Sequence, residues 1–135
     1  MLEILEQIIQ ILLADTTLTN TVPGTSIFAG PVDITMEKQA NLLYPQINIR
    51  TVGEVQHTVP IKTRETQIQL DIWSRNNLKE IETIYERVLT LLSYKSADKA
   101  TAHIFWQRLN GAVDDYESDR RVWHRACTFT VWAVK

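Results

Sequence analysis

The clearest pattern of apolar and polar residues lies in residues 66–92. Ile68, Leu70 and Ile72 alternate with polar residues, and this period of two predicts a β-strand with one buried face. Further along, the apolar residues are spaced three and four apart, which is typical of a helix with one face in a core: Leu78, Ile81, Ile84, Tyr85, Val88, Leu91 and Leu92. The segment therefore predicts a strand that leads directly into an amphipathic helix.

Two polar residues predict where this helix begins. Asn77 can act as the N-cap, because its side-chain oxygen can accept a hydrogen bond from an amide of the first turn. Glu80, three residues later, can complete a capping box, and its negative charge suits the positive end of the helix dipole. We therefore expect the helix to begin directly after Asn77.

Five further segments have the spacing of helices or strands. Residues 2–14 place their apolar side chains on one broad stripe, which predicts a helix covered on more than one side. Residues 26–29 form a short extended piece that suits the edge of a sheet. Residues 44–52 predict a second strand. Residues 102–109 and the longer segment 122–134 predict two more strands near the C-terminus.

The connection formed by residues 53–65 is longer than a tight hairpin requires. It spaces Val55, Val59 and Ile61 among polar residues and has Pro60 near its middle. We therefore expect a long, partly extended β-hairpin flap that projects from the body.

The order of these elements predicts an α+β fold. Two helices would pack in one layer against a mostly antiparallel sheet of four to five strands, with the hairpin flap projecting from it. The chain contains neither an internal repeat nor a linker, so we expect residues 1–135 to form a single domain.

Composition narrows the possible functions. The formal net charge of −2 does not favour nucleic-acid binding through a broad basic surface, which requires clustered Lys and Arg. The single cysteine, Cys127, lies in an alternating segment and is expected to be a small buried hydrophobic residue in a reducing compartment. Glu3, Glu6 and Gln7 interrupt the apolar N-terminal segment, so neither an export signal nor a membrane span is predicted.

Sequence motifs give no support for catalysis. The chain contains no Gly-rich phosphate loop, CxxC, HExxH or GxSxG motif. The three histidines, His57, His103 and His124, are far apart in the sequence, so their spacing does not indicate a metal site. The sequence therefore predicts no catalytic residue, no metal and no cofactor.

An acidic group is the best candidate for chemistry. It follows Asn110-Gly111, a pair typical of a tight turn. Its carboxylates could hold a divalent cation or supply an acid–base pair, but their spacing lacks the central glycine and distal glutamate of a calcium loop. The favoured interpretation is a solvated acidic turn, offset by two following arginines. The group comprises Asp114, Asp115, Glu117 and Asp119.

Four tryptophans lie in the predicted strands or at their ends: Trp73, Trp106, Trp123 and Trp132. Trp73 and Trp132 fall on the faces opposite the main aliphatic stripes. One interpretation is that they cover the second face of the sheet together with a helix or the flap. The other is a contact between subunits, because large aromatic residues are enriched at interfaces.

The order of elements resembles that of the tail-terminator proteins of long-tailed bacteriophages, also called tail-completion or tail-to-head joining proteins. The resemblance covers almost the whole chain and lies in the overall pattern. The matching segments are LLAD at the end of the first helix, SIFAG, YPQINI, the delayed hairpin, DIWS before the amphipathic helix, and RACTFTVWAV after the acidic turn.

This resemblance implies a structural virion protein that is made in the bacterial cytoplasm and is not an enzyme. Copies of the chain would form a hexameric ring on the end of the tail tube, end tube polymerisation and offer a docking surface to the head connector. DNA would pass through the centre without sequence-specific binding. The expected partners are therefore the chain itself, the tail-tube protein and the head connector or head-closure protein, with no membrane.

The resemblance also directs attention to particular residues. We expect the flap and two tryptophans to contact a neighbouring subunit or the ring lumen: Val55, His57, Val59, Ile61, Lys62, Arg64, Trp73 and Trp132. The acidic turn formed by residues 114–119 is a candidate for a second contact surface or for the lumen wall. Two alternatives stay open: another neck ring protein such as a head-closure protein, and a small metal-dependent hydrolase using the 114–119 carboxylates.

Overall fold

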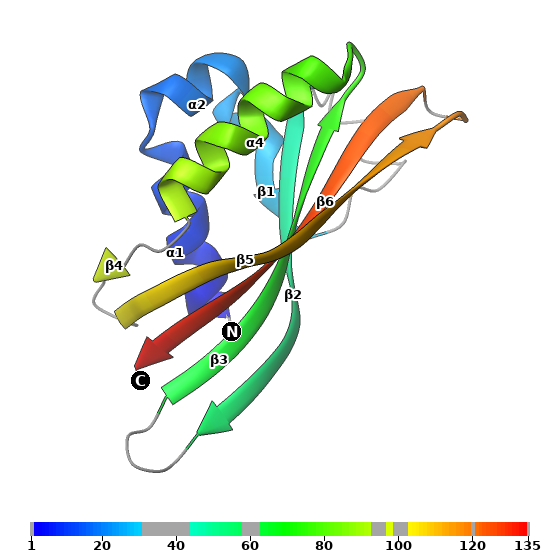
Figure 1. The fold of residues 1–135 in the computed structure, drawn as a ribbon. Coiled ribbons are helices and arrows are strands. Elements are labelled where there is room, and N and C mark those ends of the chain that lie inside the picture. The colour runs from blue at the N-terminus through cyan, green and yellow to red at the C-terminus, as the bar shows by residue number, and fades with distance from the viewer. Residues whose placement is uncertain are drawn as a thin grey trace.

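The fold is an α+β sandwich of two layers, seen in a computed structural model that describes residues 2–30, 44–57, 63–92, 97–98, 103–119 and 121–134. Figure 1 shows the elements in order. The helices are α1 (Leu2–Leu13), α2 (Thr16–Thr21), the single 3-10 turn η1 (Gly24–Ser26) and α4 (Leu78–Leu92). The strands are β1 (Ile27–Ala29), β2 (Gln46–His57), β3 (Thr63–Ser74), β4 (Ala97–Asp98), β5 (His103–Glu117) and β6 (Val122–Val134).

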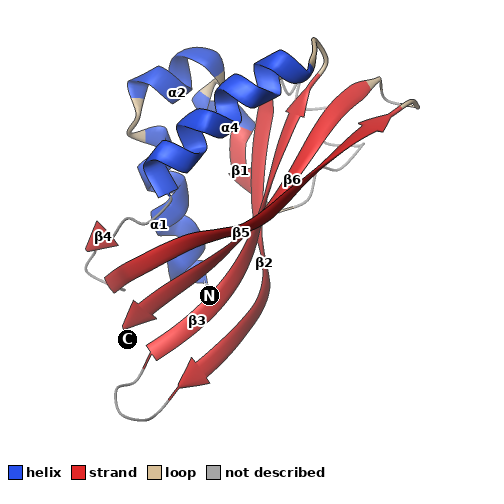
Figure 2. Ribbon diagram, in the orientation of Figure 1, coloured by secondary structure: helices blue, strands red, loops and turns tan. Residues whose placement is uncertain are grey.

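The sheet has the strand order β1-β2-β3-β6-β5-β4. β1 runs parallel to β2, and the other neighbouring pairs are antiparallel. The described helices α1, α2 and α4 lie on one side of the sheet (Figure 2). The predicted α+β class and mostly antiparallel sheet are therefore confirmed, and the structure adds the short helix α2 and the two-residue strand β4. None of the described helices is both long and apolar enough to cross a membrane.

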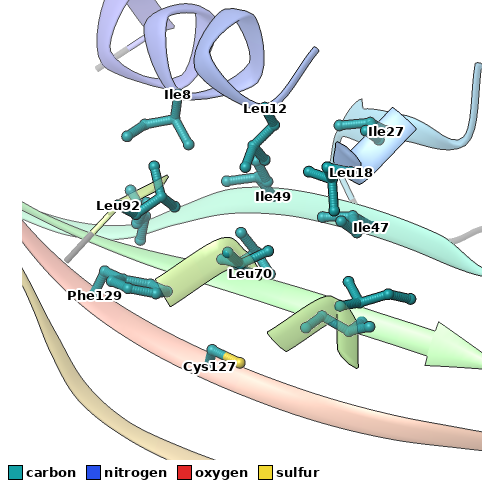
Figure 3. Packing of buried hydrophobic residues seen from close by; sticks show 14 of the residues in the cluster. Ile8, Leu12, Leu18, Ile27, Ile47, Ile49, Leu70, Leu92, Cys127 and Phe129 are labelled. Carbon is teal, nitrogen blue, oxygen red and sulfur yellow. The ribbon is translucent and has the colours of Figure 1, made fainter. Parts of the chain in front are cut away.

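The hydrophobic core lies between the helices and the sheet. α1 contributes Ile8 and Leu12, which point toward the strands in Figure 3. Apolar residues of β3 and β6 are fully buried beneath the helices, including Leu70 and Phe129, whereas Trp123 of β6 is only partly buried. Cys127 is also fully buried, and this burial raises the pKa of its thiol to about 12. The expectation that Cys127 is a buried hydrophobic residue is confirmed.

The start of α4 has the predicted N-cap, whereas the Glu80 carboxylate binds Ser74 and Asn76 in place of the Asn77 amide expected for a capping box. Asn77 Oδ1 accepts a hydrogen bond from the Glu80 amide at 2.8 Å, so Asn77 is the N-cap. The two carboxylate oxygens of Glu80 accept hydrogen bonds from Ser74 Oγ at 2.8 Å and from Asn76 Nδ2 at 2.9 Å. Glu80 thereby ties the first turn of α4 to the end of β3.

A second cap joins α2 to α4. Asp15 is the N-cap of α2 and accepts a hydrogen bond from the Leu18 amide at 2.9 Å. The Arg87 guanidinium of α4 binds the same carboxylate, with Nη2 2.6 Å from Oδ1 and Nε 2.8 Å from Oδ2. This ion pair lowers the pKa of Asp15. The pairing connects residues 72 positions apart, so helix periodicity alone gave no indication of it.

The hairpin between β2 and β3 differs from the prediction, and a long projecting flap over residues 53–65 is not confirmed. β2 continues to His57, and its partner strand begins at Thr63, with His57 opposite Thr63 and Gly53 opposite Gln67. The pairing register shifts between Thr51 and Gly53, and β2 continues through this β-bulge. Val59, Ile61 and Lys62 lie outside the described residues.

The predicted turn at Asn110-Gly111 is wrong. These residues lie inside β5, where the register of pairing with β6 shifts between Leu109 and Gly111. A glycine that suits a tight turn also suits a β-bulge, and here the strand continues past it. Pairing with β6 extends to Glu117 opposite Val122. The acidic residues Asp114, Asp115 and Glu117 are therefore strand residues, and only Asp119 lies in the turn.

Candidate interaction surfaces

The sheet presents a polar face opposite the helices. Side chains alternate between the two faces along each strand, so the neighbours of the buried aliphatic residues point away from the helix layer. We call this surface the polar face. Its members on the three central strands are Asn48, Arg50, Gln67, Gln69, Asp71, Trp73, His124, Ala126, Thr128 and Thr130.

Trp73 is the centre of a buried cluster on the polar face. Its indole Nε1 donates a hydrogen bond to Asn48 Oδ1 at 2.7 Å. Its ring stacks on the His124 imidazole, with centroids 3.9 Å apart and planes 4° apart. His124 Nε2 lies 2.7 Å from Asp71 Oδ1, so the cluster joins β2, β3 and β6.

The two tryptophans that were expected to contact a neighbouring subunit differ in how deeply they are buried. Trp73 is only 7% exposed, so its ring packs within its own subunit, and the interpretation that it covers the second face of the sheet is supported. Trp132 is partly exposed and lies opposite Trp106 and Glu65 in the adjacent strands. Trp132 therefore stays a candidate for a subunit contact.

The other expected contacts lie at the β2–β3 hairpin. Arg64 is 8% exposed, and its Nη1 lies 3.7 Å from Glu54 Oε1. Val55 and His57 belong to β2, where their backbones pair with Glu65 and Thr63. Arg64 is therefore held within its own subunit, whereas contacts made by the rest of the segment stay a prediction.

The acidic residues of β5 point to both faces of the sheet. Asp114 lies opposite Arg125, on the helix side, and Asp115 lies opposite His124, on the polar face. Consecutive strand residues point in opposite directions, so these two carboxylates cannot share one ion. Among the described residues no group of three or more His, Cys, Asp and Glu side chains could hold a metal.

Arg125 binds Asp114 in a clamp that joins both strands of the β5–β6 hairpin to α4. Its Nε and Nη2 lie 2.6 Å and 3.0 Å from the two carboxylate oxygens of Asp114. Its Nη1 lies 2.6 Å from Glu82 Oε2, and its guanidinium carbon is 4.6 Å from the centre of the Tyr85 ring. Asp114 therefore has a structural partner, and the hydrogen bonds from Arg125 lower its pKa.

This clamp predicts a loss of stability in acid. Because the pKa of Asp114 is lower in the folded chain than the ordinary 3.8, its contribution is present above that value and is lost as the pH falls below it. The Asp114→Asn variant should therefore lose about 0.5–1.5 kcal/mol near neutral pH, an amount reduced by solvent screening, and the difference from the unmodified chain should shrink as the pH falls through the lowered pKa of Asp114. Urea unfolding across this pH range measures it.

Asp115→Asn is the matched control for this experiment, because Asp115 is exposed on the opposite face of the same strand. It should change the free energy of unfolding by less than about 0.5 kcal/mol. A loss in Asp114→Asn that stays constant across the pH range would contradict a stabilising contribution from the ionised Asp114 carboxylate.

Comparison with known proteins identifies the family. The model of the family described as "Tail completion protein gp17" matches residues 6–133. The chain belongs to this family. The family confirms the resemblance found in the sequence and assigns the chain a structural role in the tail of a phage-like virion.

A solved structure has the same fold. The chain resembles a component of the "Virion of native gene transfer agent (GTA) particle", with a TM-score of 0.69 and 10% sequence identity. The match covers 95% of this chain and 92% of the other. Comparison with curated proteins gives no significant match. At this low identity, the structural match establishes a shared fold.

Proposed function

We propose that this tail completion protein forms a ring on the end of the tail tube. The ring ends tube polymerisation and offers a docking surface to the head connector, and DNA passes through its centre. The observation that carries this proposal is the match of the tail completion family to residues 6–133, which leaves almost no part of the chain outside the family pattern.

The charges of the chain are compatible with a channel that DNA must leave freely. The formal net charge is −2, whereas proteins that hold nucleic acid neutralise phosphates with clustered Lys and Arg. The polar face is composed mainly of uncharged side chains, such as Gln67 and Thr128. The exposed members of this face can be hydrated without gripping phosphate, so they are suitable as part of the wall of the channel.

No chemical step is part of this proposal. The alternative of a metal-dependent hydrolase would need several carboxylates to converge, yet Asp114 and Asp115 point to opposite faces of β5. Asp114 is also engaged by Arg125. The acidic residues are better suited to stabilising the β5–β6 hairpin and to contacts along its edge.

Deletion of the gene that encodes this chain tests the proposed function. Without the chain, nothing ends polymerisation of the tail tube. Electron microscopy should therefore show tails of excessive and variable length together with unjoined heads. Expression of the unmodified chain in trans should restore joined particles of uniform length. Normal joined particles in its absence would refute the proposal, and normal-length tails beside unjoined heads would instead indicate a neck ring protein.

A further inference from the structure

Each edge of the sheet carries one short strand, and the two short strands lie at opposite ends of the sheet. β1 pairs with β2 only at residues 47–49, and β4 pairs with β5 only at residues 103–104. Figure 1 shows β1 toward the upper end of the sheet and β4 at the opposite end. Along the rest of their length, the outer sides of β2 and β5 therefore have no described partner strand.

The register of pairing shows what lies level with β1 on the other edge of the sheet. Residues 27–29 of β1 pair with residues 47–49 of β2. Through β3 and β6, these residues of β2 are aligned with residues 112–114 of β5, in reverse order. β1 is therefore level with a part of the opposite edge that no described strand covers.

The same comparison can be made for β4. Its residues 97–98 pair with residues 103–104 of β5. Through β6 and β3, residues 103–104 are aligned with residues 56–57 at the end of β2. β4 is therefore also level with a part of the opposite edge that no described strand covers.

These two alignments allow one copy of the chain to fit beside another. If the strands and helices of both copies have the same orientation, β1 of the first copy meets residues 112–114 of the second. At the other end of the sheet, β4 of the second copy meets residues 56–57 of the first. In both places a single short strand separates β2 of one copy from β5 of the next, so one spacing between the copies satisfies both contacts.

The strand directions are compatible with backbone pairing at both places. β1 is parallel to β2, and β2 is antiparallel to β5, so β1 would meet β5 as an antiparallel pair. β4 is antiparallel to β5 and would meet β2 as a parallel pair. Unpaired backbone groups along a strand edge are a template for another strand.

The side chains that would meet across the β1–β5 contact are mainly apolar or small. Phe28 is partly exposed and would lie opposite Val113, which is 70% exposed. Ala29 and Ala112 are both exposed and would lie opposite each other on the helix side. Aromatic and β-branched residues that are opposed across strands stabilise sheets. Asp114 is bound by Arg125 of its own subunit, so no charge at this contact lacks a partner.

We propose that copies of this chain join through two strand pairings, β1 (Ile27–Ala29) with residues 112–114 of β5 and β4 (Ala97–Asp98) with residues 56–57 of β2. This inference rests on the proposed ring and names the surfaces that build it. A second copy is the favoured occupant because each edge carries the short strand that the other edge can accept. Neither pairing requires one copy to slide along the strands, and a head-to-tail contact of this kind can close into a ring.

Cross-linking between two substituted chains tests the β1–β5 contact. Ala29→Cys and Ala112→Cys are each made together with Cys127→Ala, because Cys127 lies opposite Ala112 in the same chain. The two proteins are mixed at millimolar concentration and treated with a short bifunctional maleimide. Residues opposed in an antiparallel pair have Cβ atoms about 5 Å apart, which the reagent can span. The covalent bond traps short-lived contacts, so a weak association still accumulates product.

The mixture should give a cross-linked dimer containing one copy of each variant, several-fold above either variant alone. Ala29→Cys mixed with Ser118→Cys, in the same Cys127→Ala background, is the matched control. Ser118 is also exposed on the β5–β6 hairpin but lies six residues further along it, roughly 20 Å away, so this mixture should give background only.

A second mixture tests whether both contacts belong to one joint. Gln56→Cys and Ala97→Cys proteins should also give a mixed dimer, because these positions lie level on opposite edges. Adding Val113→Asp to the Ala97→Cys chain should reduce this product several-fold, although the substitution lies at the other end of the sheet. An exposed surface position tolerates this change, so the variant should fold.

Three results would overturn the joint. They are a first mixture no better than the Ser118→Cys control, equally strong cross-linking of Ala112→Cys with itself, and product in only one of the two mixtures. If the Cys127→Ala chain does not fold, Phe28→Cys and Val113→Cys replace the first pair, with Cys127 kept because it is fully buried.

The deletion experiment separates this inference from the proposed function. Absence of cross-linked product, together with overlong tails in the deletion strain, would overturn the joint and leave the function standing. Efficient cross-linking, together with normal joined particles in the deletion strain, would overturn the function and leave only the joint.

Discussion

Phe129→Ala should lower the free energy of unfolding by about 3–5 kcal/mol, the range for removing a buried aromatic side chain. Phe129 is 1% exposed on the central strand β6, where it lies opposite Ile68 of β3 and Leu109 of β5. Removing the ring leaves a cavity beneath α4, because rigid strands on both sides cannot close around it. Chemical denaturation of the purified chain measures the loss.

Val113→Ala is the control for this experiment. It removes apolar atoms from the neighbouring strand β5 at a position that is 70% exposed. The change in the free energy of unfolding should stay below about 0.5 kcal/mol. Similar losses in both variants would contradict the placement of Phe129 in the core and of Val113 on the surface.

Trp73→Ala should also cost about 3–5 kcal/mol in the isolated subunit, because it removes a large buried ring. Trp73 stacks on His124 and donates its indole hydrogen bond to Asn48. Trp73→Phe keeps an aromatic ring for the stack and removes the donor, so its loss should be only about 1–2 kcal/mol. Unfolding of the three proteins at concentrations where they are monomeric gives the comparison.

This prediction distinguishes the two roles that the sequence allowed for Trp73. A tryptophan that packs within its own subunit stabilises the monomer, whereas an interface tryptophan affects assembly alone. An unchanged monomer combined with loss of assembly would show that Trp73 serves a subunit contact. Trp132 is partly exposed. The same comparison at Trp132 therefore tests whether this residue contacts a neighbouring subunit.

Elements with strong local signals could be predicted from the sequence. The alternation of Ile68, Leu70 and Ile72 identified β3, and the Asn77 cap identified the first turn of α4. The short piece at residues 26–29 lies at the sheet edge as β1, as expected. In each case the interactions that define the element lie within a few residues of each other, so no knowledge of the partner strand was required.

Two β-bulges lie where the sequence predicted that strands would end. Gly53 and Gly111 each follow a bulge, whereas the sequence favoured a flap at the first and a turn at the second. Glycine relieves backbone restrictions in both kinds of structure. The choice between them depends on whether a long partner strand continues alongside, which the local sequence does not encode.

The interaction surfaces could not be predicted from the sequence either, because they depend on how neighbouring strands are aligned. The contacts of Trp73 with Asn48 and His124, and that of His124 with Asp71, require the alignment of three strands. Once residues 114–117 are placed in a strand, alternation alone separates Asp114 from Asp115. The uncovered edges of β2 and β5 likewise follow from the strand order.

Binding to isolated tail tubes is the most direct test of the proposed function. Gold-labelled chain is incubated with tubes from particles that lack it, and the label is located by electron microscopy. We expect label at the single tube end that normally meets the head, together with an end to further tube growth. Label distributed along the tube, bound only to heads, or absent from both ends would contradict a ring that completes the tail.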